Sequence, residues 1–156
     1  MSANKLRSLV FPLLLVGSVP AAGWAQSGSA KSPTAAVEEF IRAASDSNLT
    51  RMAELWGTDK GSASATGRPD RYGEKIIIMQ AFMQGVSVRA LGEIPGEKGN
   101  RRQVTTEISR GPCRVTVPVI VTKVRDGWIV NNFDLERVAD VNKPCEGSSG
   151  PGNLRR

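Results

Sequence analysis

The side chains that could do chemistry are few in this sequence. It contains no histidine among 156 residues, which excludes a Ser-His-Asp triad and a histidine general base. Neither GxxxxGK[ST] nor GxGxxG occurs, so the phosphate-binding loops built on those motifs are absent as well. Carboxylates, two cysteines and a few aromatic and amide side chains remain. Each has to be judged by the element that carries it.

Cys113 and Cys145 are the only cysteines. In an oxidising compartment an even pair favours one disulfide, which would add about 3–4 kcal/mol of stability by closing a long loop. Two buried thiols or two metal ligands are the alternatives, since the sequence does not show whether the Cα atoms lie within disulfide range. A metal site is the least favoured, because neither a histidine nor a third cysteine supplies further ligands. We therefore predict no metal and no cofactor.

The N-terminus has the pattern of a secretory signal peptide. Lys5 and Arg7 precede an apolar run, and the small residues that end at Ala25 form a cleavage motif, with a second option after Ala30. The apolar run is shorter than the ~20 residues of a membrane span, which disfavours the alternative of a permanent anchor. We expect residues 1–25 to be removed and the chain to be exported, to the periplasm or outside the cell.

Cleavage of the signal peptide would lower the net charge of the chain. Its formal net charge is +6, and loss of the two basic residues of the signal peptide leaves 19 basic against 15 acidic side chains, a net charge of +4. The arginine pairs Arg101-Arg102 and Arg155-Arg156 have no interleaved aromatic residues of the kind that nucleic-acid surfaces tend to have. Solvated turns and a basic tail therefore explain them better than a nucleic-acid site, and no membrane span is expected after cleavage.

Two short helices are expected after a flexible lead at 26–32. Ser32-Pro33 predicts a helix start, because serine can cap free amides and proline fits the first helical position. Asp46–Asn48 predicts the break between the two helices. Apolar residues at helical spacing form one core stripe before the break and one after it: Val37, Phe40, Ile41, Ala44, and then Leu49, Met52, Ala53, Trp56.

The rest of the chain predicts a third helix followed by strands. Segment 58–69 consists largely of small residues and is expected to be a mobile loop. The wide apolar arc of 70–84 predicts a well-buried helix. From Val86 the period changes to two, and Asp126-Gly127 is a strong hairpin signal. The four expected strands cover 86–90, 103–109, 113–124 and 128–138. Three helices before four antiparallel strands make an α+β domain.

This order of elements resembles the nuclear transport factor 2-like superfamily, which includes ketosteroid isomerase-like and SnoaL-like proteins. The residues that carry the resemblance are Val37-x-x-Phe40-Ile41-x-Ala43-Ala44, Asp46-x-Asn48-Leu49, Leu55-Trp56 and Asp126-Gly127-Trp128-Ile129-Val130. It covers 33–139 and implies three N-terminal helices packed on a strongly curved four-stranded antiparallel sheet, a cone with a cavity at its open end. Pro118 fits a bulge in that sheet, and an exposed edge of a flatter sheet is the alternative. Residues 140–156 are expected to be largely disordered, apart from a tether at Cys145.

Catalytic members of the superfamily use an aspartate or histidine inside the cone. Asp134, in the expected last strand, is the weak candidate for such a carboxylate base. Successive side chains of a strand point to opposite faces, and Asn131 shares its face with the apolar Ile129 and Phe133. Asp134 belongs to the other, more polar set. We expect it to face water unless a bulge shifts the register by one residue.

Four residues are the candidates to line the cavity, where they could stack on a ligand and hydrogen-bond to it: Trp56, Tyr72, Thr106 and Asn131. The alternative is that Trp56 belongs to the core and Tyr72 to loop packing. We predict an exported, non-catalytic domain that holds a small apolar ligand, or that pairs through its sheet with a second copy or another envelope protein. The competing hypothesis is a small lyase or isomerase that uses Asp134 on an apolar substrate.

Overall fold

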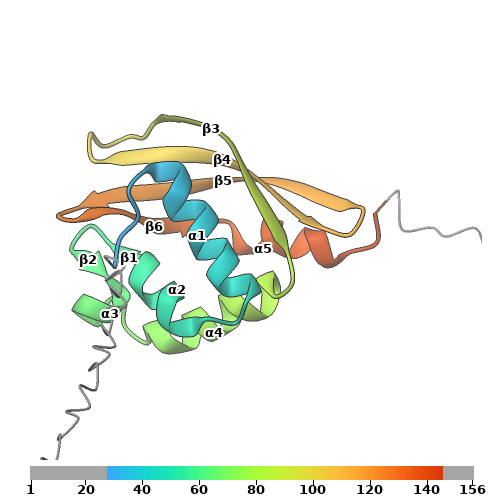
Figure 1. Ribbon diagram of the computed structural model, residues 1–156, viewed down its shortest axis with the longest axis horizontal. Helices are drawn as coiled ribbons and strands as arrows, with labels where there is room; N and C mark the ends of the chain where they lie inside the picture. Colours follow the sequence, from blue (N-terminus) through green and yellow to red (C-terminus); the bar gives the residue numbers. More distant parts are fainter. Residues whose placement is uncertain (1–27, 146–156) are drawn as a thin grey trace, which may run out of the picture.

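The computed structural model describes residues 28–145. The chain is an α+β domain, as predicted: helices from its N-terminal side pack on a four-stranded antiparallel sheet with the strand order β3-β4-β5-β6 (Figure 1). The strong curvature of a cone stays a prediction. In chain order the elements are α1 (Pro33–Ser45), α2 (Leu49–Leu55), β1 (Gly57–Thr58), β2 (Gly61–Ser62), α3 (Ala63–Thr66), α4 (Tyr72–Met83), β3 (Ser87–Pro95), β4 (Arg101–Arg110), β5 (Cys113–Val124), β6 (Gly127–Phe133), α5 (Leu135–Ala139) and the 3₁₀ helix η1 (Asp140–Asn142).

Helix α1 begins at the predicted residues. The Ser32 hydroxyl accepts the backbone N–H of Ala35 at 3.1 Å, and Pro33 occupies the first helical position. The predicted core stripe is confirmed, because all four of its members are buried: Val37, Phe40, Ile41 and Ala44. The Phe40 ring meets Phe133 of β6 edge to face, with ring centroids 5.9 Å apart. This stripe therefore fixes α1 on the sheet.

Helix α2 is held against α1 by charge as well as by its apolar side. The Asn48 side chain caps it by accepting the N–H of Arg51 at 3.0 Å. The Arg51 guanidinium then pairs with Glu39 of α1 at 2.5 Å and with Glu54 at 2.9 Å. Leu49 is 39% exposed, so the predicted second stripe starts one turn too early. Its buried members are Met52, Ala53 and Trp56.

The mobile loop predicted at 58–69 is wrong. Strands β1 and β2 pair there as an antiparallel hairpin, and the Ser62 side chain caps the short helix α3. The small residues serve close approach: a Cβ on Gly57 would lie only 2.3 Å from the carbonyl oxygen of Gly61. A run rich in small residues therefore folds here into a compact turn.

The flexible lead predicted at 26–32 is ordered where the structure describes it. Ala30 donates its N–H to the Trp128 carbonyl at 2.9 Å, and Trp128 donates its own N–H to the Ala30 carbonyl at 2.8 Å. Ser29 and Ala30 are both buried. The segment before α1 thus adds a bridge to the outer edge of β6, which a count of small polar residues does not predict.

The last strand is shorter than predicted. It ends at Phe133, and Asp134 leaves the sheet to cap α5. The ladder between β5 and β6 also skips Asn131, a bulge that gives this residue no partner in register. Phe133 lies opposite Val119 and Val130 lies opposite Val121. Beyond the bulge Phe133 therefore shares a face with Val130 and not, as predicted, with Ile129. A bulge that shifts the register is the condition under which we expected the residues of this strand to change faces.

Pro118 lies in β5, which has a neighbouring strand on each side. Its partner on β4 is Thr105, but the ladder with β6 begins only at Val119, opposite Phe133. The missing N–H of Pro118 therefore falls beyond the end of β6, where no ladder bond needs it. Pro118 therefore lies on a stretch of β5 that has a neighbouring strand on one side only.

The predicted disulfide is confirmed. Cys113 and Cys145 are bonded, with Cα atoms 5.5 Å apart, and they tether the residues after η1 to the start of β5. No helix within 28–145 is long and apolar enough to cross a membrane. The tail predicted to be disordered from residue 140 is ordered at first, because 140–142 form η1 with Val141 buried. The predicted signal peptide, its cleavage after Ala25 and the tail beyond Cys145 fall outside the described residues.

Candidate functional site

An apolar pocket opens where the end of α2, one side of α4, the end of β6 and the start of α5 meet. Its volume is about 220 Å³. Drug-sized ligands occupy pockets of roughly 300–1,000 Å³, so this one suits a smaller molecule. It is lined by Trp56, Lys75, Ile78, Met79, Asn131, Asn132, Phe133 and Leu135.

The walls of this pocket are fixed by the packing of the elements behind them. Trp56 forms an isolated parallel bridge with Val130 of β6 and is almost fully buried. Met79 is buried, whereas Ile78, its neighbour on α4, is 51% exposed. A rigid wall thus faces a partly exposed apolar rim, an arrangement that admits a ligand from solvent.

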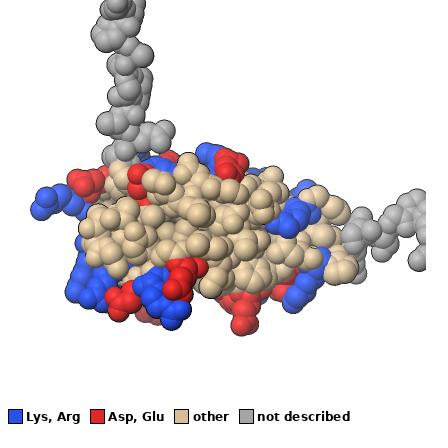
Figure 2. Space-filling view, turned by 90° about the horizontal axis from the view of Figure 1, so that it is seen from below, with Lys and Arg blue, Asp and Glu red and all other residues tan. Residues whose placement is uncertain are grey.

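The face of the molecule that carries α4 is largely apolar. Figure 2 shows it from below, with residues other than lysine, arginine, aspartate and glutamate filling its centre and charged residues gathered at its rim. The exposed apolar side chains of α4 are Ile77, Ile78 and Phe82. The predicted good burial of this helix holds on one side only: α4 packs on α1, α2 and α5, and these three side chains remain exposed.

A larger polar pocket adjoins the apolar one. It has a volume of about 730 Å³ and shares Lys75 and Asn131 with the apolar pocket. We call the two together the groove, with an apolar half and a polar half. The polar half is lined by Thr58, Asp59, Lys60, Arg68, Pro69, Asp70, Lys75, Arg101 and Asn131.

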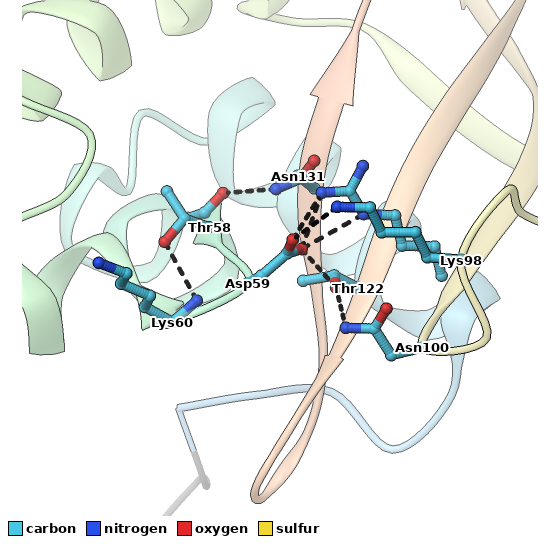
Figure 3. Close-up of polar contacts among 9 residues, drawn as sticks. Thr58, Asp59, Lys60, Lys98, Asn100, Thr122 and Asn131 are labelled. Atoms are coloured by element: carbon cyan, nitrogen blue, oxygen red, sulfur yellow. Dashed lines mark hydrogen bonds and ion pairs between the residues drawn. The ribbon is translucent and has the colours of Figure 1, made fainter.

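Asp59, at the tip of the β1–β2 hairpin, fastens that hairpin to the sheet (Figure 3). Its carboxylate accepts hydrogen bonds from Arg101 Nη2 at 2.7 Å and from the Thr122 hydroxyl at 3.0 Å. The Asn131 side-chain amide donates to the Gly57 carbonyl at 3.2 Å, which adds a second contact between hairpin and sheet. The bulge in β6 gives Asn131 its freedom to turn toward the hairpin.

The carboxylates of the polar half are engaged with arginines. Hydrogen bonds from Arg101 hold the pKa of Asp59 below its usual value, Thr122 adds to the effect, and partial desolvation opposes it. Asp70 is paired with Arg68 at 2.7 Å. The lowered pKa makes the Asp59 carboxylate a weak proton acceptor near neutral pH. Within 28–145, no group of three or more histidine, cysteine, aspartate or glutamate side chains is arranged to hold a metal ion.

Of the predicted ligand-binding residues, Trp56 and Asn131 line the groove, and Asn131 lines both of its halves. Thr106 is fully buried in the sheet, where its hydroxyl donates to the Val104 carbonyl at 3.3 Å. Tyr72 packs against the core and lines neither half.

The candidate base Asp134 also lines neither half of the groove. It is exposed, and its carboxylate accepts the N–H of Arg137 at 3.1 Å as the cap of α5. Its expected position facing water is therefore confirmed, but the reason differs, because the strand has already ended at Phe133.

Lys75 and Ile78 are groove residues that the sequence reasoning missed. The available signal was the apolar run of α4, which is too broad to be covered by a single core face. The interior between α1 and the sheet is filled: the enclosed space there has no room for a water molecule. Its lining residues are Phe40, Ile41, Met83, Ile108, Val119, Phe133 and Val138. The groove is thus open space beside a filled interior.

No family model matches the sequence, and no curated protein matches it either. Similar solved structures include an NTF2-like protein of unknown function from Cytophaga hutchinsonii, 13% identical, with a TM-score of 0.39, covering 69% of this chain and 95% of that one. Another is an LEH-like epoxide hydrolase of M. tuberculosis, 23% identical, with a TM-score of 0.33, covering 67% of this chain and 84% of that one. Likenesses this distant say nothing about a ligand or an activity.

Proposed function

We propose that this protein is an exported domain that binds a small apolar molecule in the apolar half of the groove. The observation that carries the proposal is the pocket of about 220 Å³, whose walls are mostly aromatic and aliphatic and include two amides, Asn131 and Asn132. Apolar walls with a few placed polar groups are the usual composition of small-molecule sites.

Binding has more support than catalysis. No carboxylate lines the apolar half of the groove among the described residues. The carboxylates that line the adjoining polar half are Asp59 and Asp70, and each is paired with an arginine. The competing lyase or isomerase would need a free base beside the ligand, and Asp134 is occupied with the first turn of α5.

Export is supported by the Cys113–Cys145 disulfide, because such bonds persist in oxidising compartments. The predicted signal peptide would direct the chain there.

We also propose that the protein pairs through its sheet with a second copy of itself or with another envelope protein. The edge strand β3 presents Leu91 and Ile94, both about half exposed, and bonds on one side only to β4.

A matched pair of substitutions on α4 tests the binding site. Ile78 lines the apolar half and Ile77 does not, although they are 51% and 56% exposed. In Ile78→Trp the added ring fills the pocket, so we expect the affinity for 1-octanol, measured by titration calorimetry, to fall at least about tenfold.

Ile77→Trp is the control and should keep the wild-type affinity. The proposal fails if wild type does not bind 1-octanol, or if both variants bind it as wild type does. Circular dichroism spectra and melting temperatures of the three proteins establish that the comparison is made between folded molecules.

A further inference from the structure

The two halves of the groove meet at Lys75 and Asn131, which line both. An apolar pocket that opens directly into a charged one suits a molecule with two unlike ends. We infer that the ligand is an amphipathic monoanion, an aliphatic carboxylate whose chain occupies the apolar half and whose head group lies beside Lys75. This inference rests on the proposed function and specifies the chemistry of its ligand.

The charges of the polar half are unbalanced. Its lining includes four cationic side chains and two carboxylates. Both carboxylates are already taken: Asp59 by Arg101 at 2.7 Å and Asp70 by Arg68 at 2.7 Å. The remaining cations are Lys60 and Lys75, and neither forms a salt bridge within the described part of the chain. A ligand anion would supply the missing charge.

Lys75 is the better placed of these two lysines. It lies on α4 three and four residues before Ile78 and Met79, which puts all three on one side of the helix. A lysine can lay its aliphatic stem along an apolar wall while its ammonium stays in the polar region. Lys75 does line the apolar pocket as well as the polar one. Its ammonium is thus available at the point where an apolar chain would emerge.

The size of the apolar half limits the chain. At about 30 Å³ for each water-sized group, a volume of about 220 Å³ holds about seven non-hydrogen atoms. Octanoate has a seven-carbon tail and one carboxylate, so it matches the pocket in both length and charge. Its neutral counterpart is 1-octanol, and acetate carries the same head group without the tail.

The experiment compares these three probes by titration calorimetry at neutral pH and low salt, on the full chain with its disulfide formed. Octanoate should bind wild type more tightly than 1-octanol does, and acetate should bind far more weakly. In Lys75→Met, which keeps an aliphatic stem, the affinity for octanoate should fall about 3- to 10-fold, the range of a partly exposed charge-assisted pair. The ratio of the octanoate affinity to the 1-octanol affinity should fall by a similar factor.

Arg114→Met is the control, because it removes an exposed cation at the end of the β4–β5 ladder remote from Arg101. It should bind octanoate as wild type does. Raising the salt concentration should weaken octanoate binding and leave 1-octanol binding unchanged.

Two kinds of result separate the inference from the proposed function. If 1-octanol binds and Lys75→Met leaves octanoate affinity unchanged, the anionic head group is wrong and the apolar site stands. If acetate binds as tightly as octanoate, the chain contributes nothing and the inference is also wrong. If 1-octanol does not bind wild type, the proposed function itself fails, whatever octanoate does.

Discussion

Two short segments form walls of the groove, and they are attached to the sheet in different ways. The hairpin, residues 57–62, contributes to the polar half, and the C-terminal segment, residues 134–145, contributes Leu135 to the apolar half. Strands of two residues and a helix of five are too short to be stable alone. Each segment therefore depends on what fastens it.

The hairpin is fastened without a covalent bond, by the ion pair of Asp59 and by the amide of Asn131. The C-terminal segment is fastened by the disulfide Cys113–Cys145 and by two buried valines of α5 and η1. The stability of the hairpin wall in the polar half should therefore depend on pH and salt. The stability of the C-terminal wall in the apolar half should depend on whether the disulfide is reduced. Substitutions can break either attachment separately.

Removing the disulfide should have the largest effect. The bonded cysteines are 32 residues apart, and opening such a loop frees the unfolded chain. We expect the double variant Cys113→Ala/Cys145→Ala to lose about 3–4 kcal/mol of unfolding free energy in urea denaturation. Hydrogen exchange should quicken at Val138 and Lys143, whose amides close the turns of α5 and η1.

The comparison requires that this change stays local. The amide of Ala63, which follows the hairpin and donates to the Trp56 carbonyl before it, should keep its exchange rate relative to the global unfolding of the same variant. Wild type treated with reductant should match the double variant. A stability loss below about 1 kcal/mol would mean that the buried valines alone hold the segment.

Crowding the hairpin should have the next largest effect. In Gly57→Ala the new Cβ would lie 2.3 Å from the Gly61 carbonyl oxygen and 2.8 Å from the Ser62 Cα, both backbone atoms that cannot move aside without opening the hairpin. Overpacking of this kind costs about 1–3 kcal/mol. Urea denaturation measures the loss, and faster exchange confined to 57–63 locates it.

Gly73→Ala is the matched control. Gly73 lies in the first turn of α4, and a Cβ there meets no atom within 4 Å. Since alanine is the better helix former, this variant should gain roughly 0.5–1 kcal/mol. The close-packing argument is wrong if Gly57→Ala is as stable as wild type.

The stripes and the strand periods were readable from the sequence because they are local. Val37, Phe40 and Ile41 at helical spacing require a buried helix face wherever the sheet lies. The hairpin at 57–62 was missed since its order comes from Asp59 and Arg101, residues 42 positions apart. Composition reports only that such a segment is rich in small residues. The end of β6 was missed for a related reason: Asp134 fits a strand by parity and a helix cap by chemistry, and the tertiary fold decides between them.

The groove was predictable in part. Trp56 and Asn131 were accessible to sequence reasoning, because an aromatic at a helix end and an amide among apolar strand residues are unusual enough to be noticed. Lys75 was not, since a lysine on a helix is usually a solvated residue. Its importance comes from lying one turn away from Ile78, where α4 meets the ends of α2 and β6 and the start of α5. That fact belongs to the packing of helices rather than to any local pattern.

Breaking the ion pair of the hairpin should have the smallest effect. Asp59→Asn removes the charge that Arg101 and Thr122 surround, and the Asp59 side chain is 37% exposed, so solvent screens the interaction. We expect a loss of about 0.5–1 kcal/mol at neutral pH, measured by urea denaturation. The loss should shrink in high salt, whereas that of the disulfide variant should not.

The pH dependence of this loss sharpens the contrast between the two segments. Because Arg101 lowers the pKa of Asp59 in the folded protein, the unfolded chain takes up the proton first as the pH falls. The stabilisation is therefore fully present above the unfolded carboxyl value of about 3.9 and disappears as the pH falls through the lower folded value. The stability gap between wild type and Asp59→Asn should be constant from neutral pH down to about 5 and should close below about 4. The stability difference between wild type and Cys113→Ala/Cys145→Ala should persist over the same pH range, because a disulfide does not titrate. If the stability difference between wild type and Asp59→Asn persisted in acid, the Asp59 side chain would act through its shape and hydrogen bonds and not through its charge. The two attachments would then not differ in their response to pH.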